Sequence, residues 1–354
     1  MTCFLISFLS QKARRMIVPL GVAVGVGVCA VVALVVGVAL CWRQRQTPEQ
    51  FLARYGPWAV VFGASAGVGR AVAERLAARG FDLVLVARTR ARLEAVAAAI
   101  TAAHGRQVVL VDGDVRDVRT VLATRELCAG IDVGLVVYNA SALLAGDFDA
   151  SPLESKMALL DVNVKGATAV CDVFGTLLAA RRARAKGAGL LLVSSLTGIT
   201  GSRGIALYAA SKAFLASLAV CILGCFCCFH HCGHHHCYHH HCCFSCANHQ
   251  NQQGGLWSEW QSKGITVRTS VLGVVDTPSL RERGVRPGDV PGILSPECAA
   301  EGCLRAFARV GPRHTVGLFT TLATFVVERL LPRALGVTLV SENASLVYGK
   351  PKAQ

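Results

Sequence analysis

The stretch WAVVFGASAGVGRAVAERLAARGFDLVLVAR, residues 58–88, decides the fold of this chain. It opens with an apolar run that ends in glycine, which is typical of a buried strand. Residues 67–80 then carry apolar side chains at helical spacing, and Gly80 supplies a helix stop signal. A second apolar run, residues 81–88, follows at once. Strands that are apolar on both faces are typical of a parallel sheet covered by helices, so the stretch predicts a strand–helix–strand unit.

The same alternation continues along the rest of the chain. A helical stretch that Gly105 closes leads from the second apolar run to a third. The later strands are predicted at residues 107–115, 131–141, 189–195 and 265–273. Parallel strands that alternate with helices are joined by right-handed crossovers. The chain is therefore predicted to form an α/β fold, a doubly wound parallel sheet of the Rossmann type.

The first part of the chain predicts a membrane anchor. Residues 16–42 contain no charged side chain, and about 20 apolar residues span a bilayer. A secretory signal has a shorter apolar core, so the segment predicts an uncleaved transmembrane helix. The chain then divides into a tail (1–15), an anchor (16–42), a linker (43–57), an α/β domain (58–335) and a second tail (336–354). A second uncharged stretch, residues 314–327, is short for a span, and core packing is favoured there over a lipid entry path.

The net charge of +14 does not by itself indicate a nucleic-acid partner. The basic residues are scattered along the chain, and the densest cluster is RRARAK at residues 181–186. A solvated helix end or contact with anionic lipid headgroups explains such a cluster. No zinc-finger or RNA-binding signature is present, so no nucleic acid is expected as a partner.

Cysteine and histidine are concentrated in one segment. Nine of the sixteen cysteines and nine of the eleven histidines lie between residues 221 and 249. Deleting residues 224–255 joins two halves of one predicted helix, so this segment is interpreted as an insertion. Cys and His are metal ligands, but no metal-site spacing recurs. A low-complexity insertion is favoured over a metal-binding loop, and no metal ligand is assigned.

Three glycines at the end of the first strand point to a bound phosphate. Gly63, Gly67 and Gly69 follow the strand and open the helix, where the backbone turns tightly and helix amides favour negative charge. The second strand ends at Arg88. Dinucleotide-binding folds place an acid at this point for a ribose hydroxyl, or a basic residue for a 2′-phosphate. The pattern predicts NADP(H) in preference to NAD(H).

The stretch SSLTGITGSRGIALYAASK, residues 194–212, supplies a candidate catalytic group. Lys212 follows Tyr208 by four residues, so the two side chains share one face of a predicted helix. An ammonium beside a phenol favours the phenolate, and the pair is expected to lower the pKa of Tyr208 from about 10. Such a pair passes protons near neutral pH. A surface helix with an ordinary tyrosine and lysine is the alternative.

Together these motifs resemble the short-chain dehydrogenase/reductase family from about residue 58 to residue 334. The family's cofactor motifs are matched at Gly63, Ala64, Ser65, Gly67, Val68, Gly69, Asp114, Val115, Asn139, Ala140, Val275 and Thr277. The family's catalytic tetrad is matched at Asn163, Ser195, Tyr208 and Lys212. The sequence departs from the family pattern at Phe62, Ser141 and Leu272, which stand in place of threonine, glycine and proline.

The resemblance implies a role for each matched residue. Ser195 would hydrogen-bond the substrate carbonyl, and Tyr208 would donate or remove the proton. Lys212 would hold the nicotinamide ribose and lower the pKa of Tyr208, and Asn163 would hold a relay water. Asp114 would contact the adenine. The cofactor itself carries the hydride.

Among membrane-anchored members, the sequence resembles very-long-chain 3-oxoacyl-CoA reductases and 17β-hydroxysteroid dehydrogenases most. This implies an NADPH-dependent reductase of a lipid ketone, held by a single span in the endoplasmic reticulum membrane. A retinol- or sphingoid-base-type enzyme and a catalytically impaired, anchored cofactor-binding protein are the alternatives. Family members commonly dimerise through the helix that carries Tyr208, so a homodimer is an expectation that the insertion weakens.

Overall fold

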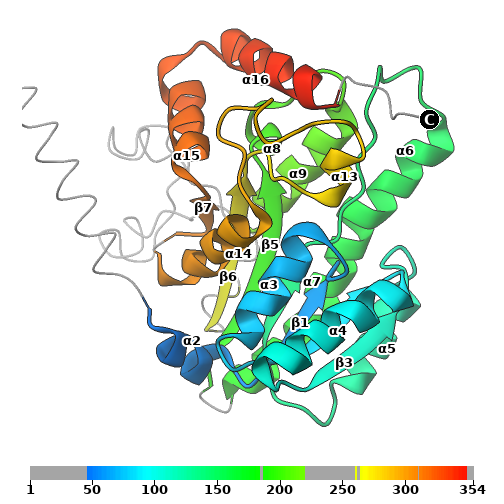
Figure 1. The fold of residues 1–354 in the computed structure, drawn as a ribbon, viewed down its shortest axis with the longest axis vertical. Coiled ribbons are helices and arrows are strands. Elements are labelled where there is room, and N and C mark those ends of the chain that lie inside the picture. The colour runs from blue at the N-terminus through cyan, green and yellow to red at the C-terminus, as the bar shows by residue number, and fades with distance from the viewer. Residues whose placement is uncertain (1–45, 184–185, 220–259, 261–263, 310, 349–354) are drawn as a thin grey trace, which may run out of the picture. The chain divides into compact units, whose positions relative to one another are not determined.

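The computed structural model describes residues 46–183, 186–219, 260, 264–309 and 311–348 (Figure 1). The predicted anchor at residues 16–42 and the predicted insertion at residues 224–255 lie outside these ranges. The described residues from Thr47 onward belong to one compact unit.

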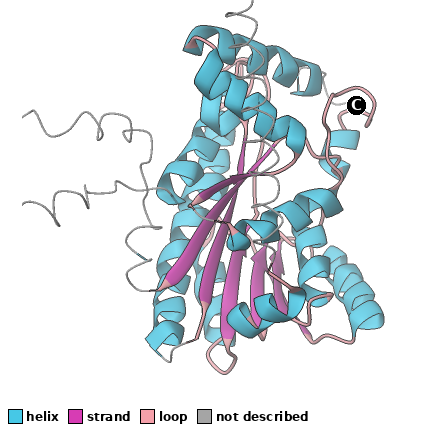
Figure 2. Cartoon of the chain, turned by 90° about the vertical axis from the view of Figure 1, so that its left-hand side faces the viewer, coloured by secondary structure: helices cyan, strands magenta, loops and turns pink. Residues whose placement is uncertain are grey.

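A seven-stranded, fully parallel sheet forms the centre of this unit, in the order β3-β2-β1-β4-β5-β6-β7. The strands are β1 (Trp58–Phe62), β2 (Asp82–Ala87), β3 (Val108–Asp112), β4 (Val133–Tyr138), β5 (Ala188–Ser195), β6 (Ile265–Leu272) and β7 (Arg313–Thr315). Figure 2 shows the strands in magenta with helices on both sides. The predicted doubly wound sheet is confirmed.

Helices cover both faces of the sheet and alternate with the strands along the chain. Those that precede β6 are α2 (Pro48–Tyr55), α3 (Gly67–Ala77), α4 (Arg90–His104), α5 (Val118–Leu127), α6 (Leu153–Leu160), the π-helix η1 (Asp161–Gly166), α7 (Ala167–Ala183), α8 (Thr197–Thr200) and α9 (Ala206–Ala219). Those that follow β6 are α13 (Pro278–Arg281), α14 (Pro296–Arg305), the 3₁₀-helix η2 (Ala306–Ala308), α15 (Leu318–Phe325), the π-helix η3 (Val326–Leu330) and α16 (Arg333–Tyr348).

The two faces of each strand enter two separate cores, because successive side chains in a strand point to opposite sides. In β1, Ala59 and Val61 pack with residues of α3, α4 and α14. Val60 and Phe62 pack on the other face with residues of α5, α7 and α9. Both faces of the sheet are therefore shielded from solvent, which explains why the strand sequences are continuous apolar runs.

Strand β7 was not among the predicted strands. It has only three residues, Arg313–Thr315, and lies at the edge of the sheet next to β6. A strand this short and this polar carries no apolar run or alternation from which it could be recognised.

The compact unit extends beyond the expected domain boundaries at both ends. Helix α2 lies inside the predicted linker and buries Phe51 and Tyr55 in the core. Helix α16 crosses the predicted boundary at residue 335, and its Val347 is fully buried. Neither segment is a free tail.

The basic cluster at residue 181 also differs from expectation. Arg181 is only 6% exposed, and its guanidinium forms an ion pair with Asp132 at 2.7 Å. It donates a further hydrogen bond to the carbonyl oxygen of Gly56. Arg181 therefore ties α7 to the segment between α2 and β1, and the interpretation of this residue as part of a solvated helix end is wrong.

Two apolar helices behave differently from one another. By length and composition, the helical run Leu153–Arg181 could cross a membrane. Its Phe174 and Leu178 are fully buried against the sheet, so core packing explains its composition. The uncharged stretch at residues 314–327 contains α15, whose Leu318 and Phe325 are exposed. Core packing, the explanation favoured from the sequence, does not account for these two side chains.

Gly69 fixes the packing of α3 on the end of β1. A Cβ atom at this position would overlap the carbonyl oxygen of Gly63 and would lie 2.5 Å from Nδ2 of Asn139. Backbone atoms of Gly63 cannot move away without opening the turn after β1, so only glycine fits here.

We expect Gly69→Ala to lower the free energy of unfolding by about 2 kcal/mol, because overpacking against backbone strains the turn. Alanine normally stabilises a helix relative to glycine, so the sign is opposite to helix propensity. Thermal unfolding followed by circular dichroism measures the effect. Gly130→Ala is the control, since a Cβ there meets nothing within 4 Å. Equal stability of the two variants would contradict this account of the turn.

Candidate active site

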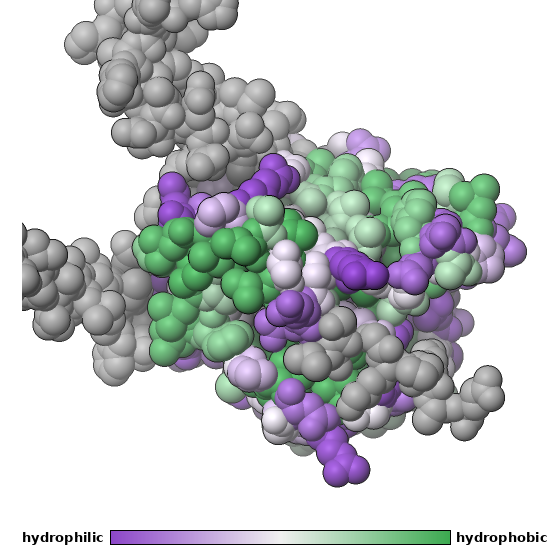
Figure 3. Space-filling view, turned by 90° about the horizontal axis from the view of Figure 1, so that it is seen from above, coloured by the Kyte–Doolittle hydropathy of each residue, from purple (hydrophilic) through white to green (hydrophobic). Residues whose placement is uncertain are grey.

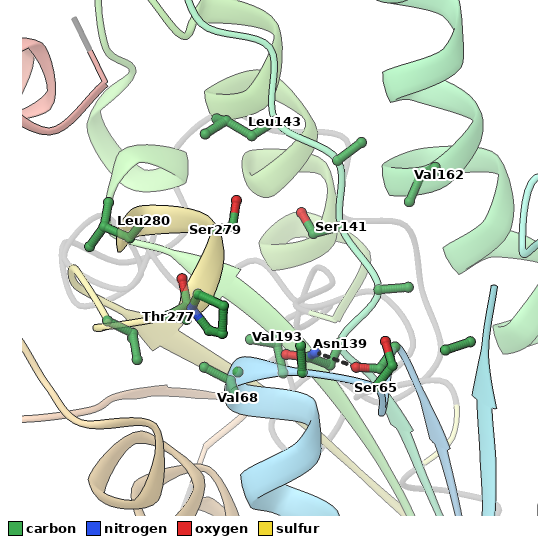
Figure 4. Close-up of a pocket in the computed structure, with 18 of the residues that line it drawn as sticks. Ser65, Val68, Asn139, Ser141, Leu143, Val162, Val193, Thr277, Ser279 and Leu280 are labelled. Carbon is green, nitrogen blue, oxygen red and sulfur yellow. Dashed lines mark hydrogen bonds between the residues drawn. The ribbon is translucent and has the colours of Figure 1, made fainter. Parts of the chain in front are cut away.

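A pocket of about 440 Å³ opens at the carboxyl end of the sheet (Figure 4). It lies where β1 has β2 on one side and β4 on the other, the topological switch point at which α/β folds bind ligands. Most of the residues singled out from the sequence line it: Gly63, Ser65, Gly67, Val68, Arg88, Asp114, Val115, Asn139, Ala140, Ser195, Tyr208, Lys212, Val275 and Thr277. Gly69 and Asn163 lie behind this lining.

The turn after β1 forms a tight cradle on the neighbouring strand. Gly63 has a φ of 80°, and a Cβ on it would lie 2.7 Å from the backbone of Ala140. Asn139 donates from its backbone to the carbonyl oxygen of Phe62 at 3.0 Å, and from Nδ2 to the carbonyl oxygen of Gly63 at 3.2 Å. Asn139 therefore ties the turn to β4.

Two arginines, one directly after β2 and one in the first turn of α4, line the pocket. Arg88 and Arg92 both line it, and within the described part of the chain neither forms a hydrogen bond or ion pair. Arg90, between them, pairs with Glu94 at 2.9 Å and with Asp112 at 3.1 Å. The guanidiniums of Arg88 and Arg92 can thus bind an anion at this end of the pocket. Arg92 was not predicted from the sequence, although it follows Arg88 by four residues.

Asp114 enters the pocket already paired. Its carboxylate accepts hydrogen bonds from the backbone and the guanidinium of Arg116, with an ion-pair distance of 2.8 Å. Partial burial works against the charged form, but the Arg116 contacts outweigh it and lower the pKa of Asp114. Asp114 is an ionised acceptor at neutral pH, which suits recognition of an N–H or O–H donor.

Helix α9 is fixed against β5 by hydrogen bonds to the strand's end. Ser194 Oγ donates to the carbonyl oxygen of Lys212 at 2.7 Å, and Lys212 Nζ donates to the carbonyl oxygen of Val193 at 3.0 Å. Lys212 is only 3% exposed. Burial lowers its pKa to about 8, because an ammonium loses hydration there. The lysine thus remains charged at neutral pH but close to its titration point.

Tyr208 lies one helical turn before Lys212, as the spacing predicted. Lys212 Nζ is 5.5 Å from the centre of its ring, and the hydroxyls of Ser195 and Ser141 hydrogen-bond to its phenol. Burial raises the pKa of Tyr208, the negative form of Tyr348 adds to the rise, and the two serines oppose it. The prediction that Lys212 lowers the pKa of Tyr208 is therefore wrong for the protein chain alone. Burial of the phenol raises its pKa more than its neighbours lower it, and Lys212 donates its hydrogen bond to the carbonyl oxygen of Val193.

Asn163 lies in the π-helix η1, within the long helical run that crosses the sheet. Its Oδ1 accepts from the backbone of Ala142 at 2.7 Å. Its Nδ2 donates to the Ala142 carbonyl oxygen at 2.9 Å and to Ser211 Oγ at 2.8 Å. π-Helical turns are frequent at functional sites because the extra residue redirects a side chain. Asn163 thereby holds together the loop after β4, the long helix and α9.

Several residues of the site carried no recognisable signal in the sequence. Ser141 stood out only as a departure from a motif, yet its hydroxyl reaches Tyr208. Tyr348 and Arg283 line the pocket from segments far along the chain. Nε of Arg283 is buried without a hydrogen-bond partner among the described atoms. Only the folded chain brings these residues to the pocket.

We expect Arg88→Ala to raise the KM for NADPH at least about tenfold and to leave the KM for NADH nearly unchanged. Loss of a charge-assisted hydrogen bond to a phosphate accounts for a change of this size. Initial rates with each cofactor measure it. Arg90→Ala is the control, since Glu94 and Asp112 already engage this side chain. Equal losses for both cofactors would show that Arg88 does not read the 2′-phosphate.

Solved structures with a similar fold are found among dehydrogenases. A 7beta-hydroxysteroid dehydrogenase aligns over 82% of this chain and 98% of its own, with a TM-score of 0.64 and 23% identity. A short-chain dehydrogenase from Sphingobium yanoikuyae, solved in complex with NADPH, aligns over 84% and 98%, with a TM-score of 0.58 and 22% identity. These likenesses establish the fold.

Curated relatives share more sequence over a shorter length. The 17-beta-hydroxysteroid dehydrogenase type 3 of Homo sapiens is 33% identical over 175 residues, 49% of this chain and 55% of that protein. The very-long-chain 3-oxoacyl-CoA reductase of Podospora anserina is 33% identical over 165 residues, 45% and 47% of the two chains. The chain thus spans about half the length of these relatives. Residues 57–222 match the family model described as short chain dehydrogenase, and this part of the chain belongs to the short-chain dehydrogenase/reductase family.

Proposed function

We propose that this protein is a membrane-bound, NADPH-dependent reductase of a ketone on a lipid, either a 3-oxoacyl-CoA or a steroid. One observation carries the proposal. A single pocket is lined by the glycine turn after β1, by Arg88, and by Ser195, Tyr208 and Lys212. Phosphate binding and proton transfer thus have their residues in one place.

The residues of the pocket fit NADP(H). The glycine cradle lets backbone approach a diphosphate closely, and the helix that follows directs its amides there. Arg88 lines the pocket at the end of β2, the position that receives a 2′-phosphate in dinucleotide folds, and Arg92 joins it from the first turn of α4. Solved relatives of the same fold contain NADPH or NADP. When bound, this cofactor supplies the hydride, and the chain supplies position and charge.

Tyr208 is proposed as the proton donor. Its raised pKa keeps the phenol protonated at neutral pH, which is the form that an acid catalyst of ketone reduction needs. Ser195 orients the substrate by donating a hydrogen bond to the carbonyl oxygen. As the carbonyl carbon accepts hydride, the proton of Tyr208 passes to that oxygen, which leaves an alcohol and a tyrosine phenolate. The Lys212 ammonium stabilises this phenolate by its charge.

Asn163 is proposed to hold a relay water, and its existing hydrogen bonds leave only its Oδ1 to bind that water. Both hydrogens of its amide are used, one by the Ala142 carbonyl and one by Ser211. Oδ1 accepts one hydrogen bond and retains a second lone pair. A water that returns a proton towards Lys212 would therefore donate to Oδ1 of Asn163.

The proposed lipid substrate is supported by the lining and by the relatives. Leu143, Val162 and Leu280 line the pocket (Figure 4), and Tyr348 joins them from α16. The curated relatives are named for steroid and 3-oxoacyl-CoA substrates. Nε of Arg283, which has no partner among the described atoms, favours a substrate with an anionic group, as a coenzyme A thioester has.

Membrane attachment is part of the proposal. The uncharged run at residues 16–42 is long enough for a single span. A lipid ketone partitions into a bilayer, so an enzyme held at the membrane meets it at a higher local concentration. We place the protein in the endoplasmic reticulum membrane by its likeness to anchored members of the family.

We expect Tyr208→Phe to lower kcat for ketone reduction about 1,000-fold, because the proton donor is lost while the ring remains. NADPH oxidation with a 3-oxoacyl-CoA, a steroid ketone, a retinoid and a sphingoid-base ketone measures this. Tyr55→Phe is the control, since the Tyr55 hydroxyl bonds Thr266 away from the pocket.

Two results would count against the proposal. Equal rates for the wild type and Tyr208→Phe would remove the tyrosine from the chemistry. NADPH binding by the wild type without turnover of any ketone in the panel would indicate a cofactor-binding protein that has lost catalysis.

A further inference from the structure

Exposed apolar side chains gather on the last part of the described chain. Seven of them form what we call the C-terminal apolar face: Leu318, Phe319, Leu322, Phe325, Leu330, Leu335 and Leu339. Their exposed fractions range from 46% at Leu339 to 77% at Leu318. Figure 3, which views the molecule from the side of α16, shows green apolar residues gathered on this side, with polar residues between and around them. Monomeric soluble proteins rarely expose so many large apolar groups together, and such patches mark binding surfaces.

Helix α15 exposes its apolar side and buries its polar side, the reverse of an ordinary surface helix. Leu318, Leu322 and Phe325 follow helical spacing on its exposed side. Thr320 and Thr324 are buried on its inner side, where Oγ1 of Thr320 has no hydrogen-bond partner among the described atoms. In water, a surface helix normally turns its apolar side to the core and its polar side to the solvent. The arrangement of α15 therefore suits an apolar environment outside the protein.

Two arginines border the apolar face. Arg329 and Arg333 line a pocket of about 450 Å³ between α8, η3 and α16, together with Thr200. Neither forms a hydrogen bond or ion pair with the rest of the described chain, whereas the nearby Arg313 pairs with Glu328 at 2.8 Å. Glu328 is the one acidic residue between positions 318 and 340 of the sequence. The border of the face is therefore positively charged.

We propose that the C-terminal apolar face binds the surface of an anionic bilayer. Its leucine and phenylalanine side chains enter the boundary between headgroups and acyl chains, and Arg329 and Arg333 bind lipid phosphates. Surface helices that combine an apolar side with basic residues bind membranes in this way. This contact is separate from the predicted span at residues 16–42 and belongs to the folded domain itself.

Charge favours a bilayer over a second copy of the chain. A twofold dimer would place the same patch on both partners. Each copy would then bring Arg329 and Arg333 to the interface, while the nearby Glu328 is already engaged by Arg313. Lipid phosphates provide the opposite charge that such a pairing lacks.

The face is connected to the proposed active site by α16. Leu335 and Leu339 lie in the first half of this helix, and Tyr348 at its end lines the main pocket. Val347 packs with Leu280, another lining residue. On the basis of the proposed function, a lipid ketone would thus reach the pocket from the bilayer that the face contacts.

Tryptophan fluorescence in the full-length protein tests the proposal. Leu322→Trp places a probe on the face, and Leu127→Trp is a matched control on α5, since the two leucines are 54% and 56% exposed. Each variant is reconstituted with vesicles of phosphatidylcholine and phosphatidylserine, with or without bromine on the acyl chains. After subtraction of the wild-type signal, we expect bromine to quench the tryptophan at position 322 about threefold more than the tryptophan at position 127.

The arginines are tested on the same probe. The double change Arg329→Gln with Arg333→Gln should reduce this quenching in phosphatidylserine vesicles and leave it unchanged in pure phosphatidylcholine. The double change Arg119→Gln with Arg125→Gln, which removes the same charge on α5, should have no effect in either.

Equal quenching of the two tryptophan probes would overturn the proposal. So would a dimer in detergent that Leu322→Asp dissociates, without bromine quenching at position 322, because the face would then bind a second copy. Reduction of a water-soluble ketone, measured on the same samples, separates this outcome from failure of the proposed function.

Discussion

A buried ammonium at the end of β5 is the constraint on which the site depends. Lys212 is almost inaccessible to water, and its charge is compensated by the carbonyl of Val193 while Ser194 holds the helix backbone from the other side. These contacts fix both the position and the rotation of α9. Tyr208, one turn earlier, is thereby brought to Ser195 at the strand's end. Desolvation lowers the pKa of Lys212 and raises the pKa of Tyr208, so both groups are protonated at neutral pH, and the ammonium is in place to stabilise the phenolate that forms when Tyr208 gives up its proton.

Asn163 extends this arrangement to the other side of the pocket. It lies where the long helix changes to a π-helical turn, and its amide joins Ala142 in the loop after β4 to Ser211 in α9. A buried amide with all its hydrogens bonded defines the spacing of the three elements, because breaking any one contact would leave a polar group unsatisfied. On the side of the pocket proposed to bind phosphate, the turn after β1 is packed so closely that Gly63 and Gly69 have no room for a side chain.

The sheet and most of the pocket could be predicted because their determinants are local. Apolar runs of strand length, glycines at strand ends and a Tyr–Lys pair at helical spacing are all visible in short windows. Strand β7 could not be predicted, because edge pairing with β6 stabilises a polar tripeptide that has no pattern of its own. The contacts of Ser141, Arg283 and Tyr348 depend on segments that meet only in the fold. The direction of the Tyr208 pKa was mispredicted for the same reason: spacing revealed the neighbouring charge, but not the burial that outweighs it.

We infer that the charge of Lys212 governs proton donation by Tyr208, and the pH dependence of ketone reduction tests this role. The measurement is the single-turnover rate of NADPH oxidation with saturating ketone between about pH 6 and about pH 10. Lys212 loses its proton as the pH rises through about 8. We therefore expect a constant rate below that pH and a fall of about tenfold per pH unit above it, with Lys212→Met slow at every pH. A wild-type rate that stays constant up to about pH 10 would contradict this inference.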